Sequence, residues 1–390
     1  MSNGMLSRRA VLGHLGALGC STAAFPAMTQ MTFASVPTDN RLVVIILRGG
    51  MDGLDVVRPL GDPNFSTLRP DLDASVHDLD GFFALHDGLA PLLPLWDAGE
   101  LAFAHAVSTP YRDKRSHFDG QDMLEAGTGT AEPDTALRDG WLNRLLETIP
   151  HAHSQTAFAI GRENLRILSG DAPVANWYPG TRLRLGSAAQ DLLADLYAAD
   201  PLFRDAAAES LHLSDVTGPD DTARGVRPEV AMAKFAADRL RQDTRIASFS
   251  LSGWDTHRNQ SRMMPRVLGR LAETIQTLKE QLGPDWARTT VLGITEFGRT
   301  VRTNGSGGTD HGTGGTMILA GGAVRGGKVY TDWPGLSEDA LYERRDLMPT
   351  TDTRAYAGSA IRGLFGTDRA DLEHLVFPGS DLSTAPSVIL

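Results

Sequence analysis

The sequence predicts an α/β fold, with a doubly wound, mostly parallel sheet and an inserted or capping middle region. Continuous β-branched apolar runs, such as RLVVIIL at 41–47, are typical of strands buried on both faces of a parallel sheet. Helical patterns separate successive runs of this kind, as parallel strands require. Glycines and acidic residues follow several runs, at the strand ends where open parallel sheets bind ligands.

The first 35 residues predict a processing segment that stands outside the fold. Arg8 and Arg9 precede a short, glycine-rich apolar run, and no acidic residue occurs before Asp39. The pattern is typical of a twin-arginine export signal, and the run is too short for a membrane span. We therefore expect export by the twin-arginine machinery, a periplasmic or secreted location, and no transmembrane span in the mature chain. Cys20, the single cysteine, would be removed with the signal.

The remaining residues, 36–390, predict a single α/β domain with a substantial core, since 41% of the chain is hydrophobic. The formal net charge is −11, and no long basic run follows the N-terminus. A nucleic acid partner needs a Lys/Arg surface to neutralise phosphates, so this composition argues against one.

The elements of this domain can be predicted in chain order. A strand at 41–47 ends in a glycine turn, and a helix at 87–100, a strand at 101–107 and a helix at 116–127 follow. The middle region, about 131–227, is less regular, with a strand at 156–161, a helix at 187–199 and a turn-rich connection at 217–229. The α/β alternation then resumes with a strand at 245–251, an amphipathic helix at 261–283 and strands at 288–295 and 316–322.

Three of these strands end in acidic clusters, which we expect to meet at one sheet edge. Carboxyl ends of parallel strands share an edge, so residues far apart in sequence converge there. A glycine-rich loop then returns an Asp-His pair to the same edge. The candidate metal ligands are Asp52, Asp255, His257, Glu296, Asp310 and His311.

Carboxylate oxygens together with imidazole nitrogens suit Zn²⁺ or Mn²⁺, while Ca²⁺ or Mg²⁺ would use mainly the oxygens. Clustered carboxylates without a cation would raise one another's pKa, which favours a bound cation. We expect one or two ions. Each residue also has an ordinary interpretation. Asp52 could shape its glycine turn, Asp255 could cap the helix that begins near Asn259, and Asp310 and His311 could be turn residues.

SHFDGQD at 116–122 supplies the candidate catalytic residues, Ser116 and His117. The stretch follows a strand and opens a helix, where a nucleophile or an anion gains from free N–H groups. Ser116 serves equally well as an N-cap, and His117 as a base, a ligand or a packed imidazole. The candidate substrate-binding residues are Arg48, Arg299 and Asn143, the last of which could also simply belong to a helix that begins at Trp141.

Seven motifs occur in the order in which they stand in a bacterial exported family, DUF1501. They are SRRAVLG, LRGGMDGLD, RSHFDGQDMLE, DGWLNR, SGWDTHRNQ, TEFGRT and GTDHGTGG. The chain resembles this family from Leu42 to about Gly366, and the family is placed with the alkaline phosphatase/sulfatase superfamily. The resemblance implies a fold of that type.

The superfamily pattern also implies roles for particular residues. Asp52 matches the first metal-binding Asp, Asp255 and His257 resemble an Asp/His pair, and His311 resembles the late histidine. Glu296 is similar to an Asp-His position, but Phe297 replaces the expected imidazole. The nucleophile position falls near His117, with Ser116 adjacent and Thr109 upstream.

Two functional hypotheses follow from these observations. The first is an exported metal-dependent hydrolase of phosphate or sulfate esters, whose substrate would be a small anionic ester. The alternative is a non-catalytic exported binding or assembly protein of the same fold, with at most a structural cation. The missing imidazole after Glu296 favours the alternative, and the convergence of acidic clusters favours the enzyme.

Overall fold

The computed structural model describes residues 38–72, 75–112, 114–129, 137–161, 163, 165–178 and 225–390. The predicted signal with Cys20, the predicted helix at 187–199 and most of the connection at 217–229 lie outside these residues. Residues Val36–Leu390 form one compact unit. Within the described ranges, no helix combines the length and the apolar character needed to cross a membrane.

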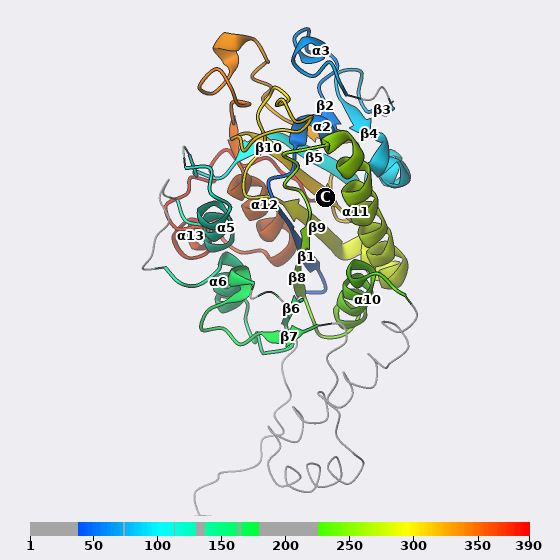
Figure 1. The fold of residues 1–390 in the computed structure, drawn as a ribbon. Coiled ribbons are helices and arrows are strands. Elements are labelled where there is room, and N and C mark those ends of the chain that lie inside the picture. Colours follow the sequence, from blue (N-terminus) through cyan, green and yellow to red (C-terminus); the bar gives the residue numbers. More distant parts are fainter. Residues whose placement is uncertain are drawn as a thin grey trace, which may run out of the picture. The chain divides into compact units, whose positions relative to one another are not determined.

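A large sheet forms the centre of this unit (Figure 1). Its strands are β1 (Arg41–Arg48), β5 (Leu101–Ser108), β6 (Ala157–Ile160), β7 (Ala175–Trp177), β8 (Ile246–Ser252), β9 (Thr289–Ile294), β10 (Gly315–Ala320), β11 (Lys328–Tyr330) and β12 (Thr351–Asp352). Their order is β11-β5-β10-β9-β1-β8-β6-β7, with β12 also paired to β5. β10 runs antiparallel to β5 and β9, and the other pairs are parallel. The predicted mostly parallel α/β sheet is confirmed.

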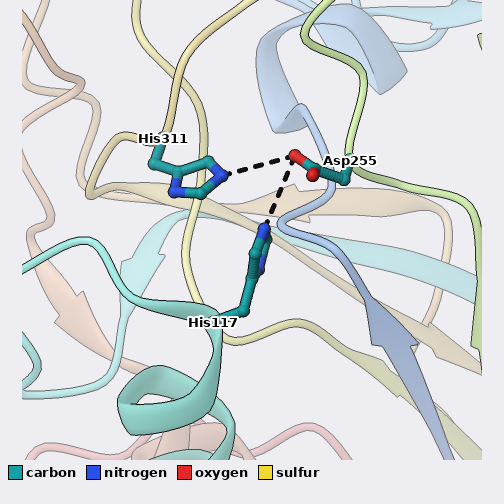
Figure 2. A group of neighbouring side chains, drawn as sticks. All are labelled: His117, Asp255 and His311. Carbon is teal, nitrogen blue, oxygen red and sulfur yellow. Dashed lines mark hydrogen bonds and ion pairs between the residues drawn. The ribbon is translucent and has the colours of Figure 1, made fainter.

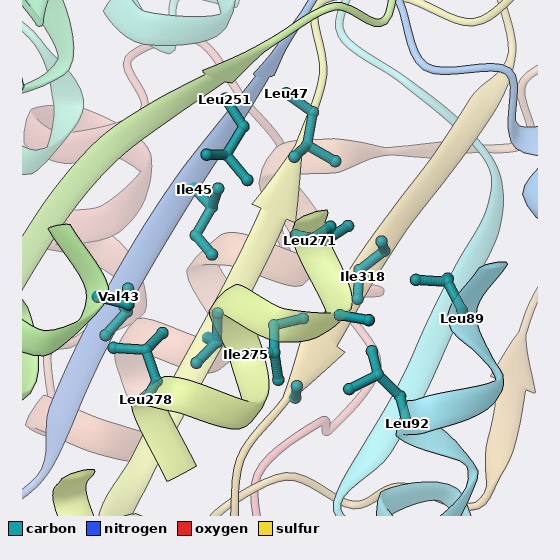
Figure 3. Close-up of a cluster of buried hydrophobic side chains, with 14 of the residues drawn as sticks. Val43, Ile45, Leu47, Leu89, Leu92, Leu251, Leu271, Ile275, Leu278 and Ile318 are labelled. Atoms are coloured by element: carbon teal, nitrogen blue, oxygen red, sulfur yellow. The ribbon is translucent and has the colours of Figure 1, made fainter. Parts of the chain in front are cut away.

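Helices cover both faces of the sheet (Figure 1). α10 (Pro228–Leu240) and α11 (Gln260–Leu282) lie on one face, and α6 (Trp141–Thr148) and α12 (Thr353–Phe365) lie on the other. The sequence of β1 is apolar without a break because its side chains point alternately into two separate hydrophobic cores, one on each face of the sheet. Val43, Ile45 and Leu47 face Leu271, Ile275 and Leu278 of α11 (Figure 3). Burial of each such side chain contributes about 1.5–3 kcal/mol.

The first predicted helix differs from the structure in kind. Residues 87–100 form a 3₁₀ helix, η1 (Asp87–Leu92), followed by a short α4 (Leu93–Asp97). Pro91 and Pro94 lack backbone N–H donors, so a continuous α-helix cannot form there. The second predicted helix is confirmed as α5 (His117–Ala126).

A smaller sheet and several short helices complete the described part of the chain. The sheet has the order β2-β4-β3. Its strands are β2 (Val57–Arg58), β3 (Val76–Asp78) and β4 (Ala84–His86). The short helices are α2 (Gly53–Val56), α3 (Phe65–Leu68), η2 (Arg166–Leu168), η3 (Gly283–Arg288), η4 (Glu338–Ala340), α13 (Arg369–Asp371) and η5 (Leu372–Val376).

The order β9-β1-β8 sets three strand ends side by side, as the sequence predicted. The turn after β1 packs closely against the loop after β8. A Cβ on Gly49, whose φ is +122°, would lie 2.5 Å from the backbone nitrogen of Asp255. Only glycine fits this approach, so the glycine turn sets how near the loop that carries Asp255 comes to β1.

Candidate metal centre

Three histidines surround one carboxylate oxygen at this edge of the sheet. Asp255 follows β8, and its Oδ1 lies 3.5 Å from Nε2 of His117, 3.1 Å from Nε2 of His257 and 3.3 Å from Nε2 of His311. Figure 2 shows His117 and His311 pointing at Asp255 from separate segments of the chain. His257 Nε2 also lies 2.9 Å from His311 Nε2. Four donor atoms from three distant stretches therefore converge.

Each imidazole is held from behind by an oxygen at its Nδ1. His117 Nδ1 lies 2.8 Å from Glu296 Oε1, and His257 Nδ1 lies 3.1 Å from Asp310 Oδ1. His311 Nδ1 lies 2.7 Å from the carbonyl oxygen of Arg115. An oxygen acceptor at Nδ1 favours the tautomer that carries its proton there. The lone pair at Nε2 is then directed at the shared centre, which is the arrangement typical of histidine ligands to metals.

The donor set fits one divalent cation. The ligand atoms of His117, Asp255 and His311 all lie within 4.8 Å of one another. Tetrahedral Zn²⁺ with bonds of about 2.0–2.1 Å separates its ligand atoms by about 3.3 Å. Four of the separations among the donor atoms of His117, Asp255, His257 and His311 are 2.9–3.5 Å, close to this value. Among the described residues, the buried Nε2 of His117 has no hydrogen-bond partner, although it lies 3.5 Å from Asp255 Oδ1.

Arg299 lies beneath Asp255 and fixes it. Its fully buried guanidinium donates from Nη2 to Asp255 Oδ1 at 2.7 Å. The same guanidinium donates to the carbonyls of Gly50, Trp254 and Thr309. Burial acts to raise the pKa of Asp255, but the hydrogen bond and charge of Arg299 outweigh it, and the pKa is lowered. Arg299 thus positions an ionised carboxylate and is itself out of reach of a substrate.

Glu296 is fully buried behind His117. Besides His117 Nδ1, its carboxylate accepts hydrogen bonds from Gly49 N, Gln121 Nε2 and Thr295 Oγ1. Burial acts to raise the Glu296 pKa, but hydrogen bonds lower it, that of His117 foremost and those of Gln121 and Gly49 N among the others. The hydrogen bond with Glu296 raises the pKa of His117. Glu296 therefore orients an imidazole of the centre.

Phe297 occupies the position where the family resemblance implies an imidazole. Its ring stacks on that of His117, with centroids 5.1 Å apart and planes inclined by 28°, and on that of Tyr111 at 6.3 Å. The aromatic packing supports one face of His117. His257, from the loop after β8, supplies a third histidine to the centre.

Asp52 is buried, and its carboxylate is paired with Arg69 and Gln260. Its Oδ2 and Oδ1 accept hydrogen bonds from Arg69 Nη1 at 2.7 Å and Nη2 at 3.1 Å, and Gln260 Nε2 donates to Oδ2 at 2.6 Å. Burial acts to raise the pKa of Asp52, but the charge and hydrogen bonds of Arg69 have a larger opposite effect, so the pKa is lowered. These contacts use the carboxylate as the partner of a buried arginine.

The other predicted residues also have partners in the structure. Ser116 is the N-cap of α5, and its Oγ accepts a hydrogen bond from Asp119 N at 3.5 Å. Arg48 donates to Gln121 and forms ion pairs with Glu125 and Glu163. Asn143 is fully buried, and its amide bonds the backbone of Leu168 and Ala172. None of these contacts brings Arg48 or Asn143 to the three histidines.

Two amide side chains that sequence reasoning missed tie the ligand loops together. Gln260 Oε1 accepts hydrogen bonds from the hydroxyls of Thr256 and Thr309, while its Nε2 donates to Asp52 and Asp55. Asn304 Nδ2 donates to the His257 carbonyl and to Asp310 Oδ1, both at 3.0 Å. Asn304 stands in a turn-rich TNGSGG stretch, which is a sequence signal for a structured turn. Gln260 gives no comparable signal.

Comparisons with known proteins give one family and several remote structural likenesses. The family described as "Protein of unknown function (DUF1501)" matches residues 39–359. A search of the curated proteins finds no match. Identities as low as those of the structural likenesses say nothing about activity.

Three of the similar solved structures illustrate these likenesses. The lipoteichoic acid synthase LtaP from Listeria monocytogenes is 9% identical with a TM-score of 0.36, covering 91% of this chain and 79% of that one. A protein in the alkaline phosphatase superfamily from Vibrio parahaemolyticus is 13% identical with a TM-score of 0.31, and the match covers 82% of this chain and 70% of that one. A TAB5 alkaline phosphatase mutant with Mg bound is 10% identical with a TM-score of 0.34, and the match covers 73% of this chain and 91% of that one.

Proposed function

The chain belongs to the DUF1501 family of unknown function, and from its own residues we propose a metal-dependent hydrolase of phosphate or sulfate esters. The observation that carries the proposal is the convergence of three imidazole Nε2 atoms on Asp255, each imidazole backed by an oxygen at Nδ1. The twin arginine at Arg8 and Arg9 adds a periplasmic or secreted location to the proposal.

In the proposal, His117, Asp255, His257 and His311 hold one divalent cation. Zn²⁺ is the first choice because three nitrogens and one oxygen are donors that it prefers, and Mn²⁺ is the second. A cation bound here would act as a Lewis acid on an ester oxygen and lower the pKa of a water molecule. The remaining residues act on the donors, since Glu296 and Asp310 orient His117 and His257, and Arg299 keeps Asp255 ionised.

The site is open to solvent on the side of Asp255, His257 and Asp310, whose side chains are 46%, 41% and 50% exposed. A small ester and water can therefore reach the donors. Ser116 already caps α5, so the proposal assigns the attack on the ester to a water molecule. The water oxygen forms the new bond to phosphorus or sulfur, the ester oxygen leaves, and the proton lost by water ends on the leaving alcohol.

The test is metal content together with turnover. Purified protein is expected to contain one Zn²⁺ or Mn²⁺ per chain by elemental analysis and to hydrolyse an aryl phosphate or an aryl sulfate. Asp255→Ala and His311→Ala should lose both properties. His374→Ala, which changes an exposed histidine elsewhere, is the matched control and should keep both. Metal-free wild-type protein, or turnover indifferent to Asp255→Ala, would contradict the proposal.

The N-cap role of Ser116 also favours a second candidate, an exported binding protein with a structural cation. For that function, metal should bind with the same stoichiometry, and chelation should lower the melting temperature. Neither the aryl phosphate nor the aryl sulfate should be hydrolysed. The same measurements therefore separate the two functions.

A further inference from the structure

A pair of arginines flanks His311, and one buried carboxylate anchors both. Asp346 is fully buried, and its Oδ1 lies 3.0 Å from Arg345 Nη1 while its Oδ2 lies 3.4 Å from Arg115 Nη2. Thr313 Oγ1 also donates to Asp346 Oδ2, at 3.0 Å. Both arginines contact His311 itself. Its Nδ1 bonds the Arg115 carbonyl, and its own carbonyl accepts a hydrogen bond from Arg345 Nη1 at 3.0 Å.

Arg345 keeps most of its hydrogen-bonding capacity unused. A guanidinium carries five N–H donors. Among the described residues, only Nη1 of Arg345 has acceptors, so Nη2 and Nε are unpaired, and the side chain is 36% exposed. Arg115 bonds Glu343 and Asp346 through Nη2, and its Nε is buried with no partner in the described part of the chain.

The two arginines suggested by the sequence are more deeply buried than Arg345. Arg299 is wholly buried and donates to Asp255 and three carbonyls. Arg48 is 14% exposed, donates to Gln121 and forms ion pairs with Glu125 and Glu163. Unlike these two, Arg345 is partly exposed, is incompletely paired among the described residues and bonds the backbone of a candidate ligand, His311.

We propose that Arg345, assisted by Arg115, binds the tetrahedral oxyanion group of the substrate beside the metal. The inference rests on the proposed function and deepens it by naming the residue that recognises the anion. Arginine suits this role because its planar fork pairs two N–H groups with two oxygens of a phosphate or sulfate. With Nη1 fixed by Asp346 and His311, the free edge formed by Nη2 and Nε is already oriented.

The test measures anion binding apart from turnover. Inorganic phosphate, and separately inorganic sulfate, are titrated into the Zn²⁺-loaded full chain by calorimetry. Arg345→Ala is expected to weaken phosphate binding about 10- to 100-fold, the range for losing a hydrogen bond to a charged group. Arg345→Lys should recover only part of the affinity, because lysine keeps the charge and loses the fork.

Arg344→Ala is the matched control in the same loop. Arg344 is 74% exposed and lies 3.8 Å from Glu338, so its removal should leave phosphate affinity unchanged. If an active ester is found, Arg345→Ala should raise KM for it while metal content stays at the wild-type value. Unchanged phosphate affinity in Arg345→Ala, an equal loss in Arg344→Ala, or loss of the metal in Arg345→Ala would each overturn the inference.

The two proposals fail in different ways. Wild-type protein that binds phosphate through Arg345 but hydrolyses no ester would remove the hydrolase and keep the anion site. Ester turnover with phosphate binding indifferent to Arg345 would keep the hydrolase and remove the anion site.

Discussion

Replacing Asp52 by Asn should destabilise the protein strongly without removing the metal ion that we propose it binds. Asp52 and Arg69 form a two-pronged ion pair of 2.7 and 3.1 Å, and their side chains are 1% and 0% exposed. Arg69 also donates to the carbonyls of Thr300 and Val301. Asn cannot neutralise the guanidinium, so the variant buries an unpaired charge. A loss of this kind costs about 3–5 kcal/mol.

The assay is urea unfolding of the Asp52→Asn variant, with metal content measured on the folded protein. Asp243→Asn, an exposed aspartate, is the control and should change stability by no more than about 0.5 kcal/mol. In the double variant Asp52→Asn/Arg69→Met both charges of the pair are removed, so neither is left buried without its partner and much of the loss should be recovered.

Two results would refute the reasoning on Asp52. A loss of less than about 1 kcal/mol would mean that the pair is not a desolvated unit. Loss of metal from a fully folded Asp52→Asn variant would make Asp52 a ligand, as the sequence alone suggested.

Three further predictions follow from the same contacts. His105 is fully buried, and burial is the main cause that lowers its pKa to about 4. Between pH 6.5 and 4 the unfolded chain binds a proton that the folded chain does not, so the free energy of unfolding should fall by about 3 kcal/mol as the pH falls through this window. In unfolding measured against pH, His105→Phe should flatten that slope. Asn143→Ala should cost about 2–3 kcal/mol in urea unfolding, because backbone groups of Leu168 and Ala172 lose their partner, while an unchanged midpoint would contradict this. If the free metal concentration before chelation is about 1,000 times its Kd, chelation should lower the free energy of unfolding by about 4 kcal/mol. A chelator that lowers the free energy of unfolding of His117→Ala as much as that of wild type would show that the ion binds elsewhere.

Strand ends could be predicted from the sequence because their signal is local. The runs at 41–47, 245–251 and 288–295 are apolar without interruption, and such strands must lie inside a parallel sheet. Once they are parallel neighbours, Asp255 and Glu296 have to lie at one edge. The α-helix predicted at 87–100 could have been corrected from Pro91 and Pro94 alone.

Partner choice among buried polar groups could not be predicted in this way. Asp52 and Asp255 have similar settings in the sequence, each after a strand and close to a glycine. What separates them is that Arg69, from an irregular segment, reaches Asp52, while three imidazoles reach Asp255. Both arrangements depend on tertiary contacts that carry no periodicity, and so no sequence pattern records them.

The amide of Gln260 has a consequence for substitution. It has two N–H donors and two acceptor lone pairs, and all four are used, by Asp52, Asp55, Thr256 and Thr309. Glutamate would set a third carboxylate against two others, and asparagine is one methylene too short to reach both sides. A substitution at this one position would leave buried polar groups on the ligand loops without partners while every histidine stays in place. In a related sequence, a glutamine at this position is therefore expected together with the histidines of the candidate metal centre.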